Sequence, residues 1–287
     1  MRLEDLVLPL RTSPRLAIAI PSSLVSEVFD SRERTRKVGY VGRAAAIFRV
    51  EEILVYVDDV PENAKFVEDV LKYLEVPPYL RKRLIAVNPN LRRVGVLPPL
   101  KAVHHVPQAF GLSIRDGVVI AASDMQSVVD AGLDKSVVVR KPLAVGKRVT
   151  VEIEKALPRQ YLGKVVEKGS IKWYWGYEVK IFNSIAELFK YLKSESYAIL
   201  CASKKGDIIY TVEEKLSKTL RTVERMCIVF GGPRLDVDEI AEKYGVNIQE
   251  YCEITANFIP RQGVESVRTE EAILIVLAII NYFKEKV

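Results

Sequence analysis

The first ninety residues alternate between short apolar runs and segments with helical spacing of apolar positions. Residues 15–21 form an apolar run that predicts a buried strand, and residues 53–57 form the next one. Apolar positions recur with helical spacing at 38–49 and at 62–73, which predicts a helix after each strand. Strands that alternate with helices favour parallel pairing through crossover helices. This part of the chain therefore predicts an α/β sheet.

The same order returns in the last hundred residues. Residues 184–192 and 212–220 predict helices, while 197–203 and 226–230 predict strands. The stretch 272–283 is almost wholly apolar, which predicts a final helix that is buried on most of its sides.

A central segment has a different texture. Short β-rich pieces at 117–121, 136–140 and 148–153 are separated by Pro, Gly and Asp, the spacing typical of a small antiparallel barrel. The prediction is an inserted β-barrel at 92–170 within a discontinuous α/β domain formed by 1–91 and 171–287.

The basic excess of the chain is also central. The formal net charge is +6, yet Arg92 to Lys180 alone carry 15 Lys and Arg against 8 Asp and Glu, which leaves the rest at −1. A local surplus of this size suits a surface that binds a polyanion, because phosphate contacts release condensed counterions. Ordinary solvated surface charge is the alternative.

Two polar loops interrupt the C-terminal pattern. Gly231, Gly232 and Pro233 follow an apolar strand-like run, and paired glycines permit close backbone approach to a ligand, although an ordinary turn has the same composition. The second loop, 257–268, lies between a strand-like run and the final helix, and loops at such positions often carry function. Thr269 is predicted as the N-cap of that helix.

These loops and a third motif resemble motifs of the SPOUT superfamily of RNA methyltransferases. Gly231-Gly232-Pro233 resembles its Gly-x-Pro-type loop, and Asn257-x-x-Pro260-x-Gln262 resembles its Asn-x-x-Pro-x-Gln-type loop. Residues 37–48 resemble its first motif, Asn-x-Gly-x-x-x-Arg-x-Ala-x-x-Phe, with Lys37 in place of the opening Asn. Over nearly its whole length the chain is most similar to the archaeal and eukaryotic branch of RNA uridine-N3 methyltransferases.

The resemblance implies a fold and a cofactor. The implied fold is a trefoil-knotted parallel sheet with helices on both faces, and the insert is expected to resemble an oligonucleotide-binding barrel. The knot is expected to hold S-adenosyl-L-methionine between the two loops. The residues implied at the cofactor are Gly231, Gly232, Pro233, Asn257, Ile259, Pro260, Gln262, Gly263, Val264, Arg268, Thr269 and Glu270.

The resemblance also implies a reaction and partners. The expected activity is methylation of uridine N3 in ribosomal RNA by a homodimer, with Arg43 as the catalytic residue that stabilises the uridine anion. The alternative for Arg43 is an ordinary arginine without a catalytic role, on a helix whose apolar residues pack against the sheet. Arg32, Arg34, Arg36 and Lys37 are expected to contact RNA phosphates, although a solvated helix start would look the same.

Two different functions stay open from the sequence. A non-catalytic RNA-binding or ribosome-assembly factor would use the basic barrel alone, and a ribose 2′-O-methyltransferase would share the fold. Dinucleotide and nucleoside-triphosphate enzymes are disfavoured, because neither Gly-x-Gly-x-x-Gly after the first strand nor Gly-x-x-x-x-Gly-Lys-Ser/Thr occurs.

Trp173, Trp175 and Tyr177 alternate with other residues and are predicted to share one face of a strand. Such a face could stack unpaired bases, but hydrophobic core is the more ordinary role. His104 and His105 are adjacent, so on a strand they would point to opposite faces, and no metal site is predicted.

The three cysteines bear on location. Cys201, Cys227 and Cys252 lie in or beside apolar runs without metal-ligand spacing, which predicts buried reduced thiols and a reducing, cytoplasmic compartment. The apolar run after Glu271 is far shorter than the roughly 20 residues that cross a bilayer, so no membrane segment is expected.

Overall fold

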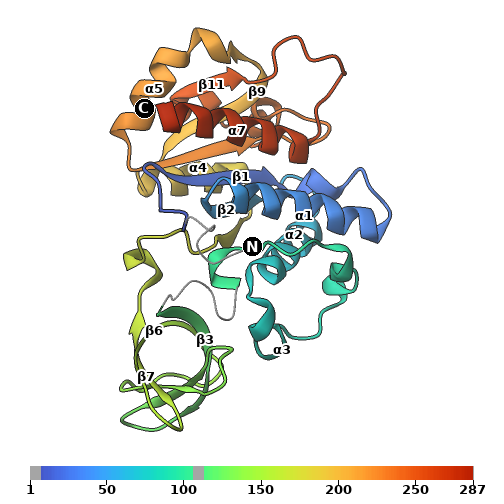
Figure 1. Cartoon of the computed structure of the whole chain (residues 1–287). Coiled ribbons are helices and arrows are strands. Elements are labelled where there is room, and N and C mark those ends of the chain that lie inside the picture. Colours follow the sequence, from blue (N-terminus) through green and yellow to red (C-terminus); the bar gives the residue numbers. More distant parts are fainter. Residues whose placement is uncertain (1–7, 106–112, 287) are drawn as a thin grey trace. The chain divides into compact units, whose positions relative to one another are not determined.

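The computed structural model describes residues 8–105 and 113–286, which belong to two compact units (Figure 1). We call them the sheet unit and the barrel unit. The sheet unit comprises Thr12–Lys72, Asn90–Pro98 and Tyr177–Val287, and the barrel unit comprises Met1–Arg11, Tyr73–Pro89 and Pro99–Gly176. The domain boundaries predicted at 92 and 170 stay a prediction, and residues 106–112 of the predicted insert lie outside the described residues.

The sheet unit is built on six parallel strands in the order β11-β9-β10-β1-β2-β8. This arrangement confirms the predicted parallel α/β sheet. The direction in which successive strands are added reverses beside β1, which pairs with β2 on one side and with β10 on the other. The strand bounds are β1 Arg15–Pro21, β2 Val50–Tyr56, β8 Glu178–Phe182, β9 Ala198–Ile208, β10 Arg225–Phe230 and β11 Ile254–Asn257.

Helices cover both faces of this sheet (Figure 1). One face carries α1 and α7, which pack on each other and on β2 and β10, whereas α4 and α6 pack together against β2, β8 and β9. Alternate residues of each strand supply the two layers, so Ala17 and Ala19 pack with Leu188 and Phe189 of α4. The helix bounds in this unit are α1 Ser31–Ile47, α4 Ile185–Ser194, α5 Glu213–Thr222, α6 Val237–Lys243 and α7 Thr269–Lys286, and α2 Pro61–Glu75 continues into the barrel unit.

Helix α1 begins earlier than its apolar spacing predicts. The helix starts at Ser31 rather than near Val38, because the Asp30 carboxylate caps it. Asp30 Oδ1 accepts from the backbone N–H groups of Arg32 at 2.9 Å and Glu33 at 3.0 Å. The cap extends the helix through a polar stretch that has no apolar period.

One prediction about the final helix is wrong. Thr269 is the first residue of α7 rather than its N-cap, and its hydroxyl donates to the carbonyl of Gly231 at 3.0 Å. The helix has buried residues along its length, such as Ile273, Leu277 and Ile280, and is exposed along one side, where Leu274, Ile275 and Tyr282 keep 46%, 36% and 62% of their surface.

The barrel unit contains a closed five-stranded barrel in the order β3-β4-β5-β7-β6. Its interior is filled by small β-branched residues such as Val119, Val129 and Val151. The predicted barrel is confirmed, but β5 and β7 pair in parallel, so it is not wholly antiparallel. Helix α3 spans Arg81–Leu84, and the strands are β3 Ile114–Ala122, β4 Ser127–Asp130, β5 Val137–Val139, β6 Arg148–Ala156 and β7 Tyr161–Val166.

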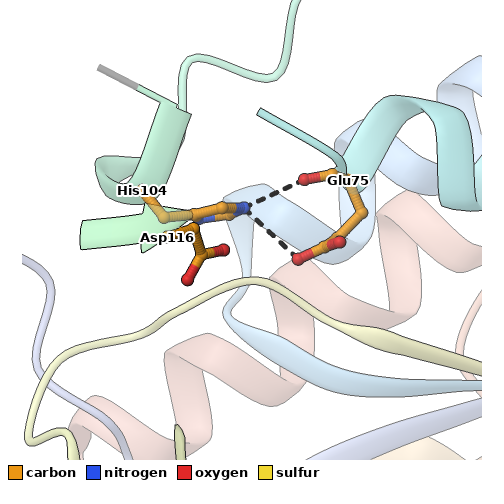
Figure 2. Close-up of side chains that lie close together, drawn as sticks. All are labelled: Glu75, His104 and Asp116. Carbon is orange, nitrogen blue, oxygen red and sulfur yellow. Dashed lines mark hydrogen bonds and ion pairs between the residues drawn. The ribbon is translucent and has the colours of Figure 1, made fainter. Parts of the chain in front are cut away.

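A cluster of buried charges lies beside this barrel. Glu75, His104 and Asp116 come close together from α2, from the 3₁₀ turn Val103–His105 and from β3 (Figure 2). Arg148 of β6 forms ion pairs with both carboxylates. We refer to these four residues as the barrel-unit ionic cluster.

The segment 173–177 is not a strand, contrary to the prediction. Gly176 takes a positive φ of +82°, and β8 begins only at Glu178. Trp175 is buried in an apolar cluster with Val103 and Ile171, and its Nε1–H donates to Asp116 at 2.9 Å. Hydrophobic core is therefore the role of Trp175, not base stacking.

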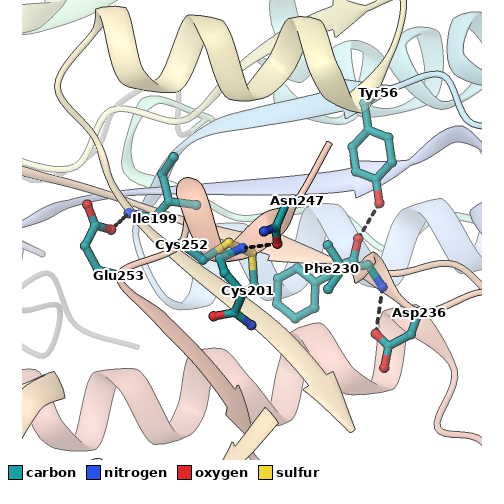
Figure 3. Close-up of a disulfide and its surroundings, with 10 residues drawn as sticks. Tyr56, Ile199, Cys201, Phe230, Asp236, Asn247, Cys252 and Glu253 are labelled. Carbon is teal, nitrogen blue, oxygen red and sulfur yellow. Dashed lines mark hydrogen bonds between the residues drawn. A yellow bond between two sulfur atoms is a disulfide. The ribbon is translucent and has the colours of Figure 1, made fainter. Parts of the chain in front are cut away.

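Cys201 and Cys252 form a disulfide, so the prediction of reduced thiols is wrong for this pair (Figure 3). Cys201 lies in β9 and Cys252 precedes β11, and these strands are neighbours although the cysteines are 51 positions apart in sequence. Cys227 is free and buried, as predicted. Among the described residues, no helix combines the length and the apolar character needed to cross a membrane.

Candidate functional site

A cavity of about 460 Å³ opens at the carboxyl ends of β10 and β11, beside the middle of β9. Parallel strands present their carboxyl ends at one edge of a sheet, and such edges are the usual binding sites of open α/β sheets. The lining comes from residues 202–204 within β9 and from the last residues of β10 and β11 with the loops that follow them. One wall comes from the first turns of α7, including Thr269, Ala272 and Val276.

Seven of the twelve residues predicted at the cofactor line this cavity, and five do not. The lining set is Gly231, Gly232, Pro233, Asn257, Ile259, Gln262 and Thr269. The residues outside the lining are Pro260, Gly263, Val264, Arg268 and Glu270. The two predicted loops therefore meet at one cavity, although the loop after β11 contributes fewer residues than its motif suggested.

The first loop is held by hydrogen bonds from both sides. The hydroxyl of Tyr56 donates to the carbonyl of Phe230 at 2.6 Å (Figure 3), and Thr269 donates to the next carbonyl, that of Gly231. Burial raises the pKa of Tyr56 well above its usual range, so the phenol remains a donor. A Cβ on Gly231 would lie 2.8 Å from the backbone nitrogen of Val237, which explains the need for glycine there.

The second loop is shaped by its own amide side chains. Asn257 donates to the carbonyl of Lys204 at 3.0 Å and accepts from the N–H of Ile259 at 2.9 Å. Gln262 donates to the carbonyls of Val264 and Glu265 at 2.9 and 3.0 Å. Both amides thus fix the backbone, and the loop is organised before any ligand binds.

Asp236 belongs to the cavity but was missed from the sequence. It accepts from the Ser203 hydroxyl at 2.8 Å and from the N–H of Lys204 at 3.1 Å, and with Glu239 it forms a capping box at the start of α6. The Asp-x-x-Glu spacing after the Gly-Gly-Pro loop was a usable sign of this cap.

A second missed group lies behind the Gly232 wall, and we call Ser22, Ser23 and Asp58 the serine–aspartate cluster. Asp58 Oδ1 accepts from Ser22 Oγ at 3.0 Å and from the N–H of Ser23 at 2.9 Å, and Oδ2 accepts from Ser23 Oγ at 2.6 Å. A Cβ on Gly232 would be 2.5 Å from Ser23 Oγ. The polar pairs directly after two predicted strands could have identified these residues, since the ends of adjacent parallel strands meet.

Arg43 and the basic run lie on α1. Arg43 is partly buried and is not among the residues that line the cavity. Arg32 is exposed, Arg36 pairs with Glu33, and the Arg34 guanidinium donates to Asn63 at 2.6 Å.

Lys37 does not suit the predicted contact with RNA phosphate. Only 7% of its side chain is exposed, and its ammonium pairs with Glu27 and lies 3.5 Å from Glu270 Oε2. This placement joins α1 to the first turn of α7. The RNA contact of Lys37 stays a prediction, and Glu270, to which Lys37 is joined, does not line the cavity.

A family model described as "Putative RNA methyltransferase" matches residues 15–280 of this chain. The chain belongs to this family. Two relatives of this chain are named 28S rRNA (uridine-N(3))-methyltransferase. The Drosophila melanogaster protein is 31% identical over 93% of this chain and 61% of its own length, and the Homo sapiens protein is 30% identical over 93% and 77%.

An uncharacterized protein of Haloarcula marismortui is 32% identical over 90% of this chain and 95% of its own length. The chain thus spans a little under two thirds of the fly relative and nearly all of the archaeal one. Among solved structures, the SpoU methyltransferase AviRb from Streptomyces viridochromogenes matches with a TM-score of 0.40 and 8% identity, covering 97% of this chain and 63% of its own. This level of likeness supports no conclusion about the chain.

The barrel-unit ionic cluster is the other group of chemical interest in this family member, and it corrects the prediction for the histidines. His104 and His105 lie on a 3₁₀ turn, so both Nε2 atoms face one group, the carbonyl of Glu75, at 3.1 and 2.8 Å. Burial lowers the pKa of His105 to about 3, which keeps that ring neutral.

Three of these side chains could hold a cation by spacing alone, since ligand atoms of Glu75, His104 and Asp116 lie within 4.8 Å of one another. However, Arg148 pairs with both carboxylates, and Lys168 lies 3.6 Å from Glu75. Two negative charges therefore already face two positive ones. The cluster is better explained as a paired structural network than as a metal centre.

Proposed function

We propose that this chain is an S-adenosyl-L-methionine-dependent methyltransferase that acts on N3 of a uridine in ribosomal RNA. The observation that carries the proposal is the single cavity at which the Gly231–Pro233 loop and the Asn257–Gln262 loop meet. Membership of the RNA methyltransferase family and the names of the fly and human relatives support the choice of reaction and substrate.

The cavity lining fits a ligand with an apolar ring system and charged ends. Its volume is in the range of about 300–1,000 Å³ found for small-molecule sites. Phe258 and Val276 supply apolar surface, while Asn257, Asp236 and Glu265 supply polar groups. Bound there, the cofactor supplies an activated methyl group on a sulfonium, and the preformed loops orient it.

Arg43 is our proposed catalytic residue, reached from a second subunit of a homodimer. Tyr40 and Ile47 stand three and four positions from Arg43 on α1, so the three share one helix face. The side chains of Tyr40 and Ile47 are 61% and 52% exposed. Helix α7, which packs on α1, also exposes the apolar side chains of Leu274 and Tyr282. A partner that covered this apolar face would bring its own Arg43 toward the first subunit's cavity.

The chemistry gives Arg43 its role. Methylation at N3 requires that the imide proton leave, and the negative charge that develops on the uracil is stabilised by a fixed guanidinium. The barrel, whose strands lie in the basic central segment, together with Arg32, Arg34 and Arg36, would bind the surrounding RNA phosphates.

Two finer expectations stay predictions. The trefoil knot is supported by the return of the chain from β11 at the sheet edge to α7, whose first residue bonds to the Gly231 loop. Cytoplasmic location rests on the RNA substrate alone, because the Cys201–Cys252 disulfide removes the support drawn from reduced thiols.

The test replaces Arg43 with Ala and measures methylation of ribosomal RNA by nucleoside mass spectrometry, together with cofactor binding by titration calorimetry. We expect N3-methyluridine from the parent and none above background from the variant, with cofactor affinity unchanged within about twofold. The exposed Arg221→Ala on α5 is the matched control and should stay active. Full turnover in the Arg43 variant would refute its role.

The same experiment separates the alternatives. A ribose 2′-O-methylated product would replace the N3 assignment. A folded parent that binds neither S-adenosyl-L-methionine nor S-adenosylhomocysteine, even with RNA present, would favour a non-catalytic RNA-binding factor.

A further inference from the structure

The serine–aspartate cluster shares a backbone wall with the cofactor cavity. Gly232 lines the cavity whereas Asp58 does not, and a Cβ at Gly232 would lie 2.5 Å from Ser23 Oγ and 3.5 Å from Asp58 Oδ2. Ser22 and Ser23 follow β1, Asp58 follows β2 and Gly232 follows β10. The cluster therefore lies at the point where the strand order reverses beside β1, the place at which open parallel sheets bind substrates.

The Asp58 carboxylate keeps capacity for one more donor. A carboxylate offers about four lone-pair positions, and Ser22 Oγ, Ser23 N–H and Ser23 Oγ occupy three of them. Oδ1 receives two of these bonds and Oδ2 receives one. Oδ2, the oxygen nearer Gly232, is thus able to accept a hydrogen bond from a ligand N–H.

We propose that Asp58 is the general base of the methyl transfer, a role that rests on the proposed function. Asp58 Oδ2 accepts the N3–H of the target uridine and takes its proton, which leaves a neutral carboxylic acid. N3 forms its new bond to the methyl carbon while the carbon–sulfur bond breaks and its electron pair stays on sulfur. The proton then passes from Asp58 to solvent, so charge and atoms balance.

The surroundings of Asp58 suit a base. Burial raises the pKa of Asp58, the hydrogen bonds from Ser23 and Ser22 lower it, and the adjacent Asp59 charge raises it, with a net upward shift. A carboxylate with a raised pKa is a stronger base.

The other elements around Asp58 bring few charges. Asn63 of α2 donates to Asp59 at 2.8 Å and accepts from Arg34 of α1, so the guanidinium of Arg34 is bonded to an amide. Tyr56, on the same strand as Asp58, has a neutral phenol, and Tyr244 beside α6 donates to the carbonyl of Val57 at 3.3 Å. Within the part of the chain that the structure describes, the donors that bond to Asp58 are the neutral hydroxyls of Ser22 and Ser23 and the N–H of Ser23.

A purely structural role must be distinguished, because the Ser23 N–H that bonds to Asp58 lies in the short 3₁₀ turn Ser22–Val25. Asp58→Asn keeps the size and one acceptor oxygen but removes the base. Asp59→Asn is the matched control, since Asp59 also accepts from Ser22, at 2.5 Å, but is exposed and has no contact with Gly232 in the described structure.

The experiment measures kcat on ribosomal RNA across pH, with cofactor affinity and thermal melting for each variant. We expect Asp58→Asn to lower kcat by about 10²- to 10⁴-fold, the usual contribution of a general base, with cofactor affinity within about threefold. The parent's rate should fall on the acid side as Asp58 becomes protonated, and this limb should vanish in Asp58→Asn. Asp59→Asn should stay within about threefold of the parent.

Each contrary outcome has a distinct meaning. Parental turnover in Asp58→Asn, or equal losses in both variants accompanied by lower melting temperature and weaker cofactor binding, would overturn the assignment. A parent that yields no N3-methyluridine would instead overturn the proposed function. Because the parent is measured first, the two failures cannot be confused.

Discussion

The cavity of the sheet unit, which we propose as the cofactor site, and the ionic cluster of the barrel unit are built from different chemical groups. The cavity is made largely of backbone held by neutral groups, such as the Tyr56 and Thr269 hydroxyls that fix two successive carbonyls. The cluster concentrates Glu75, Asp116 and Arg148 in a buried place where each charge faces another.

The contrast shows why charge density is a poor guide to function in this molecule. Burial alone would raise the pKa of Glu75, yet the His104 hydrogen bond and the Arg148 charge outweigh it and hold that pKa well below its usual range. Asp116 is held low in the same direction, chiefly by Arg148 against the effect of burial. The strongly shifted carboxylates of the ionic cluster stabilise structure, and neither of them lines the cavity.

The largest expected effect comes from breaking the cluster. Arg148→Met should lower the free energy of unfolding by about 3–5 kcal/mol, because it leaves two buried carboxylates without their cation. Only 21% of the Arg148 side chain is exposed, so solvent screens the pair weakly. Urea unfolding at pH 7 measures the loss.

Arg83→Met is the matched control for that experiment. Arg83 also pairs with a carboxylate of the same unit, Asp130, at 2.8 Å, but 53% of its side chain is exposed. Its loss should cost at most about 1 kcal/mol. Equal losses in the two variants would contradict the view that burial gives the Arg148 pairs their weight.

A smaller effect is expected from crowding the cavity wall. Gly231→Ala should weaken cofactor binding at least tenfold, or about 1.4 kcal/mol, because the new methyl group meets the backbone of Asp236 and Val237 at 2.8–3.0 Å. Gly95→Ala is the control, since nothing lies within 4 Å of a Cβ there. Calorimetric titration that gave equal affinities for the two variants would remove the Gly231 loop from the binding site.

The smallest effect concerns pH. The pKa values of Glu75 and Asp116 are lowered in the folded chain, so their contribution to stability is present above the unfolded pKa and is lost as pH falls through the folded pKa. The gap in unfolding free energy between parent and Arg148→Met should therefore narrow by about 1 kcal/mol or more below about pH 4. A gap that stayed constant with pH would mean that packing, not charge, explains the Arg148 effect.

The sequence predicted the sheet and the barrel well because both depend on local period. A short apolar run such as Arg15–Pro21 predicts a buried strand in an α/β protein, and the spacing of Gly, Pro and Asp in the central segment favours a barrel. The sequence-based prediction failed where a side chain caps a helix or bonds to a distant part of the chain. The Asp30 cap lengthened α1, and Cys201 met Cys252 only because β9 and β11 are neighbours.

The sequence predicted the residues of the candidate site where the backbone requires glycine. It did not predict residues whose surroundings depend on contacts between distant parts of the chain. Gly231 and Gly232 were identified by their motif, and both line the cavity. The burial of Lys37 was not predicted, because a lysine within a basic run gives no sign that it will pair with Glu27 and Glu270. Asp58 was not predicted, because its proposed role depends on its position beside Ser23 and Gly232, which follow two other strands.

The hydrogen bond from Thr269 to Gly231 joins two parts of the cavity that are synthesised at different times. The Gly231 loop and the strands around it leave the ribosome first, but one cavity wall belongs to α7, from Thr269 to Val276. A growing chain that ends before α7 has its cofactor loops without their closing wall. Under the proposed function, the site for the methyl donor is therefore complete only once the final helix has been made.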